Sequence, residues 1–390
     1  MKESDQGLFR LHNIVYMIDG LGMGGAERLM VPLLKHLNRE VFNPRVCVFQ
    51  IKGGNPIADQ LRAINIPVDY LPIPYLRDIS ALSRLRRYLK MVQADLVHTQ
   101  LEFADILGNI SSKLLRLPSV CTIHTMPSQE IGIKGKTHQR AEWLALRLFC
   151  DRIISVSEEA RLYHLNISHV TPEKVITIYN GIDLSHAQSI DQEKERINVR
   201  GELRIPAAAN LLTTVAVLRD LKGIQFMIRA MPEILAACPD TYYLIAGDGA
   251  YRGALVEEVA KLGVEKTVVF AGMRNDIPRI LAASDIFILP TLTEALPTVL
   301  AEAMAARLPI IASSVGGVPE MVNDHQNGRL VSPGNVQELT AAVVELLSDA
   351  AARKSMGSSG WEVVHKKFNI SEQVRQLGAL YHNLLKRYGK

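Results

Sequence analysis

Residues 13–37 read NIVYMIDGLGMGGAERLMVPLLKHL and contain a strand, a glycine turn and a helix in succession. The run from Asn13 to Ile18 is apolar without alternation, which is typical of a parallel strand buried on both faces. Apolar residues recur at helical spacing from Ala26 to Leu37, and four glycines lie between the two elements. This succession is the repeating unit of a parallel sheet whose strands are joined by helices.

The same unit recurs along both halves of the chain. Further buried strands are expected at Arg45–Phe49, Asp95–His98, Ser119–His124, Arg152–Val156 and Lys174–Ile178. After a break the series restarts, with strands expected at Leu211–Val217, Tyr242–Ala246, Thr267–Phe270, Asp285–Leu289 and Pro309–Ala312. Helical patterns separate most of these strands, so we expect two doubly wound parallel sheets.

The break between the two series is polar and charged, and it has no strand pattern. We therefore predict an α/β protein of two Rossmann-like domains, at residues 1–185 and 210–370, joined by a linker at residues 186–209. A helix at residues 371–390 is expected to cross back to the first domain. The length of 390 residues suits two domains, because single cores seldom grow beyond about 250–300 residues.

The composition disfavours several classes of protein. The chain has 44 Lys and Arg against 40 Asp and Glu, and this small excess is not the basic stripe of a nucleic-acid binder. The four cysteines are far apart in sequence, so we expect no zinc site and buried free thiols in a reducing compartment. We see no apolar leader and no run of 18 apolar residues, so we expect a cytoplasmic protein.

The first glycine turn also fits a dinucleotide-binding fingerprint, because Gly20, Gly22 and Gly25 have the GxGxxG spacing. A dehydrogenase would also need an acidic residue at the end of the next strand, to bind the ribose of its nicotinamide cofactor. Residues 49–52 read FQIK, so the dehydrogenase alternative is disfavoured. The turn still offers backbone amides and a helix N-terminus to an anion.

Charged and glycine-rich loops follow the strands of the second half. Arg219 and Lys222 come after its first strand, beside Gly223, and two cations next to backbone amides suit a diphosphate. Met273 and Arg274 follow its third strand, in a loop whose backbone groups can bind the edge of a nucleobase. Open α/β sheets bind their ligands at the carboxyl ends of the strands, so we expect one site there.

Another loop at this edge, residues 291–302, leads into a helix. A proline suits the helix start, and the backbone amides of Leu296, Thr298 and Val299 are then available to bind phosphate. Glu302 lies on the apolar helix that follows. A carboxylate there needs a partner, which is either a pair of sugar hydroxyls or a protein cation.

Taken together, these motifs resemble the retaining GT-B glycosyltransferases of family four. Glu294 and Glu302 have the spacing of that family's E-x7-E motif. Other segments similar to its motifs are Lys222–Gly223, Gly247–Gly249, Gly316–Glu320, Gly24–Glu27, Asp151–Ser157 and Asn180–Asp183. The resemblance spans about residues 13–375 and implies a GT-B fold, with the ligand in a cleft between the two domains.

The resemblance also implies roles for individual residues. Glu302 would hold the ribose of a nucleotide-sugar donor, and Glu294 the hydroxyls of the transferred sugar. Lys222 and Arg219 would neutralise the diphosphate. The first domain would contribute Gly24 and Gly25 near the diphosphate and His124 near the sugar.

Two positions depart from the family pattern. The family usually has Gly-Arg-Leu before the Lys-Gly pair, but residues 216–218 read AVL, and the nearby arginine is Arg219. Ala295 follows Glu294 where glycine is usual, which narrows the backbone conformations of that turn. Neither change removes a charge.

We therefore expect retaining transfer of a sugar from a UDP- or GDP-sugar to a hydroxyl of a glycan, a lipid-linked acceptor or a small molecule. No Asp-x-Asp motif occurs, so neither a metal nor another cofactor is expected at the diphosphate. Two alternatives remain open, a nucleotide-sugar epimerase on the same fold and a nucleotide-sugar binder without catalysis.

Two basic stretches of the first half are candidates for a contact with an anionic membrane. Their residues are Arg84, Arg86, Arg87 and Lys90 in one, and Lys134, Lys136, Arg140, Trp143 and Arg147 in the other. Each cation near anionic lipid contributes about 1 kcal/mol. The alternative is an ordinary solvated helix face, so a peripheral position at the inner face of the membrane stays open beside a purely cytoplasmic one.

Overall fold

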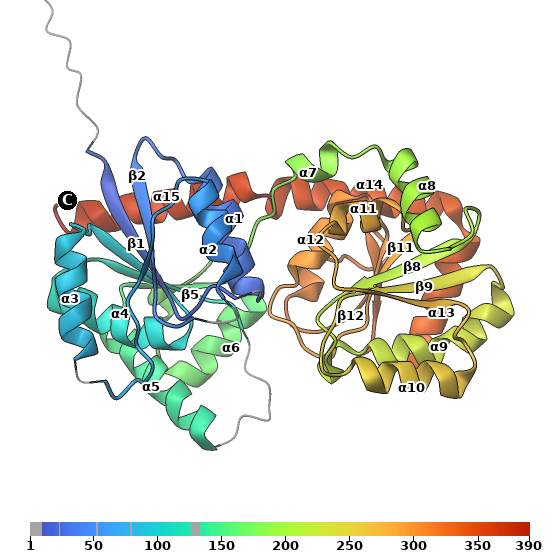
Figure 1. Ribbon diagram of the computed structural model, residues 1–390, viewed down its shortest axis with the longest axis horizontal. Helices are drawn as coiled ribbons and strands as arrows, with labels where there is room; N and C mark the ends of the chain where they lie inside the picture. The colour runs from blue at the N-terminus through green and yellow to red at the C-terminus, as the bar shows by residue number, and fades with distance from the viewer. Residues whose placement is uncertain (1–9, 23, 52–53, 79, 126–132) are drawn as a thin grey trace, which may run out of the picture. The chain divides into compact units, whose positions relative to one another are not determined.

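The computed structural model describes residues 10–22, 24–51, 54–78, 80–125 and 133–390. The chain divides into two compact units (Figure 1). Unit 1 comprises Met1–Asn180 and Ile370–Lys390, and unit 2 comprises Gly181–Asn369. Each unit is a parallel sheet with helices on both faces, so the predicted α/β architecture is confirmed.

Within the described part of unit 1, seven strands form a sheet in the order β3-β2-β1-β4-β5-β6-β7. They are β1 (His12–Ile18), β2 (Phe42–Val48), β3 (Val68–Tyr70), β4 (Leu96–Gln100), β5 (Ser119–Ile123), β6 (Arg152–Ser155) and β7 (Val175–Thr177). Each strand is parallel to its neighbours. The chain winds outward in one direction from β1 and in the other from β4, so the topological switch point lies between these two strands.

Both faces of this sheet are covered by helices. One face packs against α1 (Gly25–His36), α2 (Pro56–Ala63) and α15 (Ile370–Arg387), and the other against α3 (Ala81–Met91) and α4 (Glu102–Leu114). Helices α5 (Ile133–Phe149) and α6 (Glu158–Ser168) pack beside β5 and β6. The last helix, α15, belongs to unit 1 (Figure 1). Its buried Leu377 and Tyr381 are part of the same core as Ile14 and Leu34.

Unit 2 has the same design. In its described residues the strand order is β10-β9-β8-β11-β12-β13, all parallel. The strands are β8 (Asn210–Val215), β9 (Thr241–Ala246), β10 (Val268–Gly272), β11 (Ile286–Leu289), β12 (Ile310–Ser313) and β13 (Gly328–Val331). The two edge strands that the sequence analysis missed, β3 and β13, have only three and four residues.

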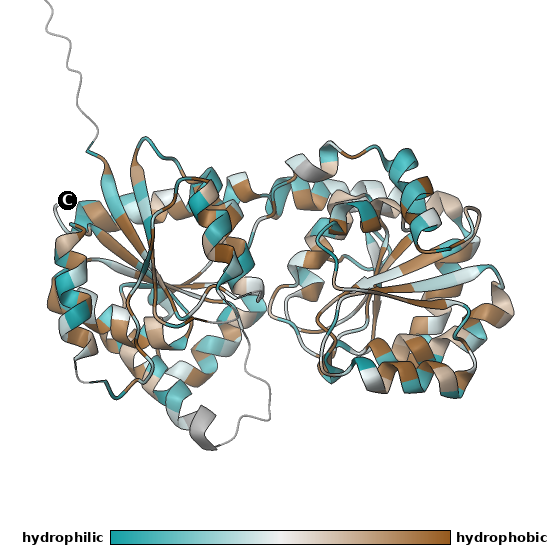
Figure 2. Cartoon of the chain, in the orientation of Figure 1, coloured by the Kyte–Doolittle hydropathy of each residue, from teal (hydrophilic) through white to brown (hydrophobic). Residues whose placement is uncertain are grey.

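The helices of unit 2 also lie on both faces. Helices α9 (Ile224–Ala237), α10 (Arg252–Leu262) and α13 (Val336–Ser348) share one core, and α8 (Gln192–Glu202) and α11 (Ile277–Ala282) share the core on the opposite face. Helix α12 (Thr298–Ala305) packs against α14 (Ala350–Lys367). Figure 2 shows apolar residues along many of the strands and apolar and polar residues mixed along the helices.

The segment predicted as a linker, residues 186–209, differs from that prediction. It is largely helical and lies in unit 2, where α7 (Ser185–Gln188) is followed by α8. The charges that resembled a linker form ion pairs with the rest of the unit, Arg196 to Asp285 at 2.8 Å and Arg279 to Glu195 at 2.5 Å. A high charge content is therefore compatible with a packed helix when the partners come from another element.

Arg200 of α8 is buried beneath this ion-pair network, with only 1% of its side chain exposed. Its guanidinium donates to Asp285 Oδ2 at 2.8 Å and to the carbonyls of Ala283 and Ala209 at 3.1 and 2.6 Å. These bonds attach α8 to the strand ends of the sheet. A buried cation in this position stabilises the unit only while all of its partners remain in place.

Arg200→Met is expected to lower the free energy of unfolding by about 3 kcal/mol, because buried carbonyls lose their donor. Arg196→Met removes a half-exposed partner of the same carboxylate, and such pairs contribute about 0.2–1 kcal/mol. Urea unfolding of both variants measures the difference. Equal effects of the two substitutions would show that the buried arginine does not anchor α8.

Candidate functional site

The switch point of the unit 2 sheet lies between β8 and β11, which are neighbours although β9 and β10 separate them in sequence. The chain leaves these two strands toward opposite faces, and ligands of open α/β sheets bind in the crevice that this creates. The loop after β8 carries Lys222, and the loop after β11 carries Glu294. Two residues selected from the sequence therefore follow the two strands that border the switch point.

Two glycines let the loops at this edge approach one another closely. Gly223 has φ +67°, and a Cβ atom there would lie 1.8 Å from the carbonyl oxygen of Pro290. Gly316 has φ +50°, and its Cβ would lie 1.7 Å from the carbonyl oxygen of Glu294. A side chain at either position would overlap backbone, so these approaches require glycine.

Backbone hydrogen bonds join the same loops. Leu292 N donates to Leu221 O at 2.8 Å, which links the loop after β11 to the loop after β8. Gly317 N donates to Ala295 O at 3.1 Å, which links the loop after β12 to the loop after β11. The backbone around Glu294 is therefore held from both sides.

Lys222 and Glu294 form an ion pair, in which the ammonium Nζ donates to the carboxylate Oε1. Their side chains are 27% and 15% exposed, so both groups are partly shielded and still accessible. Charged hydrogen bonds of this kind are stronger than neutral ones. The arrangement places one cation and one carboxylate side by side, able to bind an anionic group and hydroxyl groups of the same ligand.

The N-terminus of α12 lies directly after this loop. Pro297 is its N-cap residue and makes no side-chain capping hydrogen bond. The amides of Thr298 and Val299 have no intrahelical acceptor at this position of a helix, so they suit an anion. Leu296 is buried before the helix, and Glu302 is half-buried one turn inside it.

The remaining unit 2 candidates differ in their contacts. Arg219 is exposed before the short helix η2 (Asp220–Lys222), and Met273, after β10, is 68% exposed. The guanidinium of Arg274 donates to Asp276 at 2.7 Å and to Glu202 at 3.2 Å, and its hydrogen bond to Asp276 raises its pKa. The Arg274 side chain is thus committed to protein carboxylates, which leaves the backbone of that loop for ligand contacts.

The unit 1 candidates follow β1 and β5. Gly24 is the N-cap residue of α1 and Gly25 its first residue, and both are exposed, whereas Met23 lies outside the described residues. An added Cβ at Gly25 would meet nothing within 4 Å, so no packing contact of the described residues requires glycine there. These two glycines expose backbone at a helix start, as an anion site needs.

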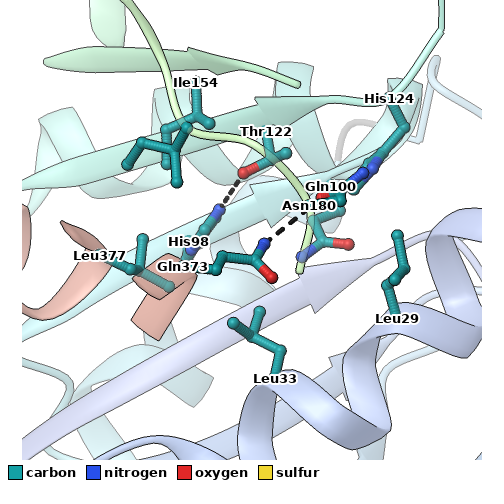
Figure 3. Close-up of a pocket in the computed structure, with 11 residues that line it drawn as sticks. Leu29, Leu33, His98, Gln100, Thr122, His124, Ile154, Asn180, Gln373 and Leu377 are labelled. Carbon is teal, nitrogen blue, oxygen red and sulfur yellow. Dashed lines mark hydrogen bonds between the residues drawn. The ribbon is translucent and has the colours of Figure 1, made fainter. Parts of the chain in front are cut away.

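His124 follows β5 and borders a small cavity (Figure 3). Both ring nitrogens are buried and have no hydrogen-bond partner among the described residues. Burial lowers the pKa of His124 to about 4, so the ring is neutral at pH 7. A neutral imidazole with two unpaired nitrogens can donate one hydrogen bond and accept another.

The sequence analysis missed several buried polar residues of unit 1. Asp19 follows β1 and accepts from the amides of Phe103 and Ala104, at 3.2 and 2.8 Å, at the start of α4. The carboxyl of Asp105 is buried and that of Glu142 is half-buried, and burial raises the pKa of Asp105 well above its usual value and that of Glu142 to about 7. The sequence signal for Asp105 and Glu142 was a carboxyl side chain within an otherwise apolar helical segment.

Comparisons with known proteins cover most of the chain. A model of the group 1 glycosyl transferases matches residues 195–362, and a model of glycosyltransferase family 4 matches residues 23–186. The UDP-Gal:alpha-D-GlcNAc-diphosphoundecaprenol alpha-1,3-galactosyltransferase of Escherichia coli is 27% identical over 93% of this chain and 95% of its own. The N-acetyl-alpha-D-glucosaminyl L-malate synthase of Bacillus anthracis is 23% identical over 80% of each chain.

Solved structures share the fold. Alr3699/HepE of Anabaena, in complex with UDP, superposes with a TM-score of 0.85 at 23% identity, covering 95% of this chain and all of the other. WaaG, a glycosyltransferase involved in lipopolysaccharide biosynthesis, gives a TM-score of 0.74 at 18% identity, over 94% and 99% of the two chains. The two parallel sheets with their helices are those of the GT-B fold.

Gly316→Ala is expected to lower the free energy of unfolding by about 1–3 kcal/mol, because the added methyl group must displace the carbonyl of Glu294. Gly253→Ala, at a position of α10 where a Cβ meets nothing within 4 Å, should leave stability unchanged or slightly higher. Thermal and urea unfolding measure both. A Gly316→Ala protein as stable as the wild type would contradict the close approach of these loops.

Proposed function

Because this chain belongs to the group 1 glycosyl transferases, we propose that it transfers a sugar from a UDP-sugar to an acceptor hydroxyl with retention of configuration. The observation that carries the proposal is the ion pair of Lys222 and Glu294 beside the N-terminus of α12. A donor of this class has a diphosphate, which needs cations and amides, next to a sugar, which needs hydrogen-bond acceptors. The unit 2 site offers both within one edge of the sheet.

In this proposal the donor diphosphate replaces Glu294 as the partner of the Lys222 ammonium. The two negative phosphates attract the cation more strongly than one carboxylate does, and the exposed Arg219 adds a second charge. The amides of Thr298 and Val299 complete the anion site. Glu294, released from its partner, then accepts hydrogen bonds from hydroxyls of the transferred sugar.

The nucleoside is bound by the neighbouring groups. Glu302, one turn into α12, would accept hydrogen bonds from the ribose hydroxyls. Met273 provides an exposed apolar side chain, and the backbone beside Arg274 provides polar groups for the base. Gly24, Gly25 and His124 belong to unit 1, and their proposed contacts with the diphosphate and the sugar stay predictions.

The chemistry consists mainly of stabilising the departing UDP and a sugar with oxocarbenium character, by charges and amides already in position. Retention would follow from attack of the acceptor on the face that UDP leaves, with a phosphate oxygen taking the acceptor proton. The relatives support retention of configuration, because the names of the Escherichia coli and Bacillus anthracis enzymes specify α products. Common UDP-hexoses are themselves α-linked, so an α product corresponds to retention.

The choice of UDP rests on the relatives. The Escherichia coli enzyme is named for UDP-Gal, and Alr3699/HepE was solved with UDP and with UDP-glucose. The two alternatives, an epimerase and a binder without catalysis, differ from a transferase in when the nucleotide appears. A transferase releases stoichiometric UDP only when an acceptor is supplied, so a nucleotide-release assay with and without acceptor separates it from both alternatives, and analysis of the recovered donor for a changed sugar separates an epimerase from a binder.

Three substitutions test the roles in unit 2. Lys222→Ala is expected to lower kcat/KM for the donor by about tenfold to a hundredfold, the loss of one charged hydrogen bond. Glu294→Ala should mainly lower kcat, because its contacts tighten in the transition state, and Glu302→Ala should mainly raise the donor KM. Steady-state kinetics with varied UDP-sugar measures these effects.

A double variant and a control complete this test. If Lys222 and Glu294 act as a pair, the double alanine variant should lose less than the sum of the two single losses. Lys266→Ala removes an exposed lysine outside the site and should keep wild-type kinetics. Wild-type kinetics in the folded Lys222, Glu294 and Glu302 variants would refute the proposed donor site.

We also propose that the reaction needs no divalent metal, because Lys222 and Arg219 supply the charge at the diphosphate. Activity is then expected to persist in excess EDTA. The assay compares initial rates with EDTA, with magnesium and with manganese. Complete loss of activity in EDTA with recovery on adding manganese would disprove metal independence.

The acceptor proposed here is lipid-linked, in view of the diphosphoundecaprenol acceptor in the name of the Escherichia coli relative. Helix α5 presents an exposed face that combines apolar and cationic side chains, as contact with an anionic membrane requires. Leu144 and Leu148 are more than half exposed there, next to the exposed Arg140 and Arg147. Trp143 faces the core instead. Lys134 and Lys136 lie outside the described side chains.

The other basic stretch, on α3, supports the membrane contact less well. Arg84 is paired with Asp78, and Leu85 and Leu89 are buried in the core, which leaves Arg86, Arg87 and Lys90 as exposed cations. No helix in the described part of the chain is long and apolar enough to cross a bilayer. The proposed contact is therefore peripheral, through the exposed face of α5.

Sedimentation with vesicles tests this contact. Binding to anionic vesicles is expected at low salt and should weaken at physiological salt, because charges contribute to it. The double variant Leu144→Ser and Leu148→Ser should bind less, whereas Ile197→Ser, at an exposed position of α8, should bind as the wild type does. Equal and negligible binding to anionic and neutral vesicles would favour a water-soluble acceptor.

A further inference from the structure

Four buried polar side chains form a continuous hydrogen-bonded chain through the core of unit 1. Tyr16 of β1 and Tyr381 of α15 share a bond of 2.8 Å between their hydroxyls. The Tyr381 hydroxyl lies 2.5 Å from His98 Nδ1, and His98 Nε2 lies 2.7 Å from Thr122 Oγ1. The chain thus connects α15 with three strands of the sheet.

The direction of this chain follows from where its one remaining hydroxyl hydrogen can find an acceptor, in the closed core at Tyr16 or beside the cavity at Thr122. Burial lowers the pKa of His98 to about 3, so its ring is neutral and carries one N–H. If that hydrogen were on Nδ1, Tyr381 would donate to Tyr16, and the Tyr16 hydrogen would have no acceptor among the described residues. An unpaired buried donor costs about 1–3 kcal/mol.

In the opposite direction, the hydroxyl hydrogens of Tyr16 and Tyr381 and the N–H of His98 all have acceptors. Tyr16 donates to Tyr381, Tyr381 donates to His98 Nδ1, and His98 donates from Nε2 to Thr122 Oγ1. Thr122 has then accepted a bond, and its own hydroxyl hydrogen needs an acceptor elsewhere. This direction of the hydrogen bonds therefore leaves the Thr122 hydroxyl free to donate on the side that faces away from His98.

The open side of Thr122 is the cavity below His124, which has a volume of about 20 Å³ (Figure 3). This is room for a single water-sized group. In the part of the chain that the structure describes, Gln100 Oε1 and both ring nitrogens of His124 are buried here without a hydrogen-bond partner. Leu29 and Ile154 form apolar parts of the wall.

We propose that this cavity binds one hydroxyl group, from a water molecule or from a substrate, between Thr122, Gln100 and His124. The hydroxyl accepts a hydrogen bond from Thr122 and donates to a ring nitrogen of His124, and a water molecule, which has a second hydrogen, also donates to Gln100 Oε1. The polarised chain behind Thr122 thereby holds the His124 ring in one tautomer. His98, Tyr381 and Thr122 are positioning residues, and only the catalytic benefit of orienting His124 rests on the proposed function.

High-resolution crystal structures test the occupancy. We expect an oxygen about 2.6–3.2 Å from Thr122 Oγ1 and within hydrogen-bond distance of Gln100 Oε1. A water that persists when UDP-glucose is bound identifies water as the occupant, and its replacement by a sugar oxygen identifies a substrate hydroxyl. A cavity without an oxygen both with and without UDP-glucose overturns the proposal.

Nitrogen NMR of histidine-labelled protein tests the direction of the chain. In the wild type we expect His98 to carry its hydrogen on Nε2. Thr122→Val should change the ring nitrogen shifts of His124, whereas Thr122→Ser, which keeps the hydroxyl, should preserve them. A wild-type His98 protonated on Nδ1 overturns the proposal even if Thr122→Val fails to fold. Ring nitrogen shifts of His124 that stay unchanged in folded Thr122→Val also overturn the proposal.

These readouts do not depend on turnover. If no UDP-sugar is ever consumed, the proposed function fails, but the occupancy of the cavity and the tautomer of His98 are still measured. Conversely, an active transferase with an unoccupied cavity loses only this inference. The two proposals are therefore tested separately.

Discussion

The backbone of Gly316 lies against the carbonyl of Glu294 with no space for a side chain, and the unit 2 site depends on this contact. It fixes the turn that carries Glu294, while Gly223 fixes the turn that carries Lys222 against Pro290. Rigid backbone on both sides keeps the ammonium and the carboxylate together before any ligand arrives. Electrostatic catalysis needs such preorganisation, because charges that must first move into place lose their advantage.

Much of this could be predicted from local patterns. Apolar runs indicated most strands, and glycine and charged residues at their ends indicated the edge that carries the site. Partners distant in sequence were not predictable in the same way. Lys222 and Glu294 were selected separately, but nothing in the residues alone showed that they pair across 72 positions. Helix α8 was missed because its charges find partners on α11 and beside β11.

The two units achieve polar organisation by different means. In unit 2 the loops approach through glycine, so main-chain groups and a few charged side chains suffice. In unit 1, polar side chains lie inside the sheet itself, in strands whose apolar neighbours suggested a plain core. Tyr381 and His98 are 283 residues apart, and only the return of α15 to unit 1 brings them into contact. A sequence pattern of buried strands therefore does not predict such a hydrogen-bonded chain unless each polar residue in the strands is considered separately.

The division of unit 1 into two segments has a consequence for how the protein is made. All seven of its described strands are synthesised before unit 2, yet α15 follows only after about 190 further residues. At about 5–20 residues per second, the nascent sheet waits roughly 10–40 s for the helix that covers one of its faces. During that interval the core that contains Ile14 and Leu34 lacks the apolar side chains of α15, so the nascent first unit exposes apolar surface, whereas the continuous second unit can fold as soon as it emerges.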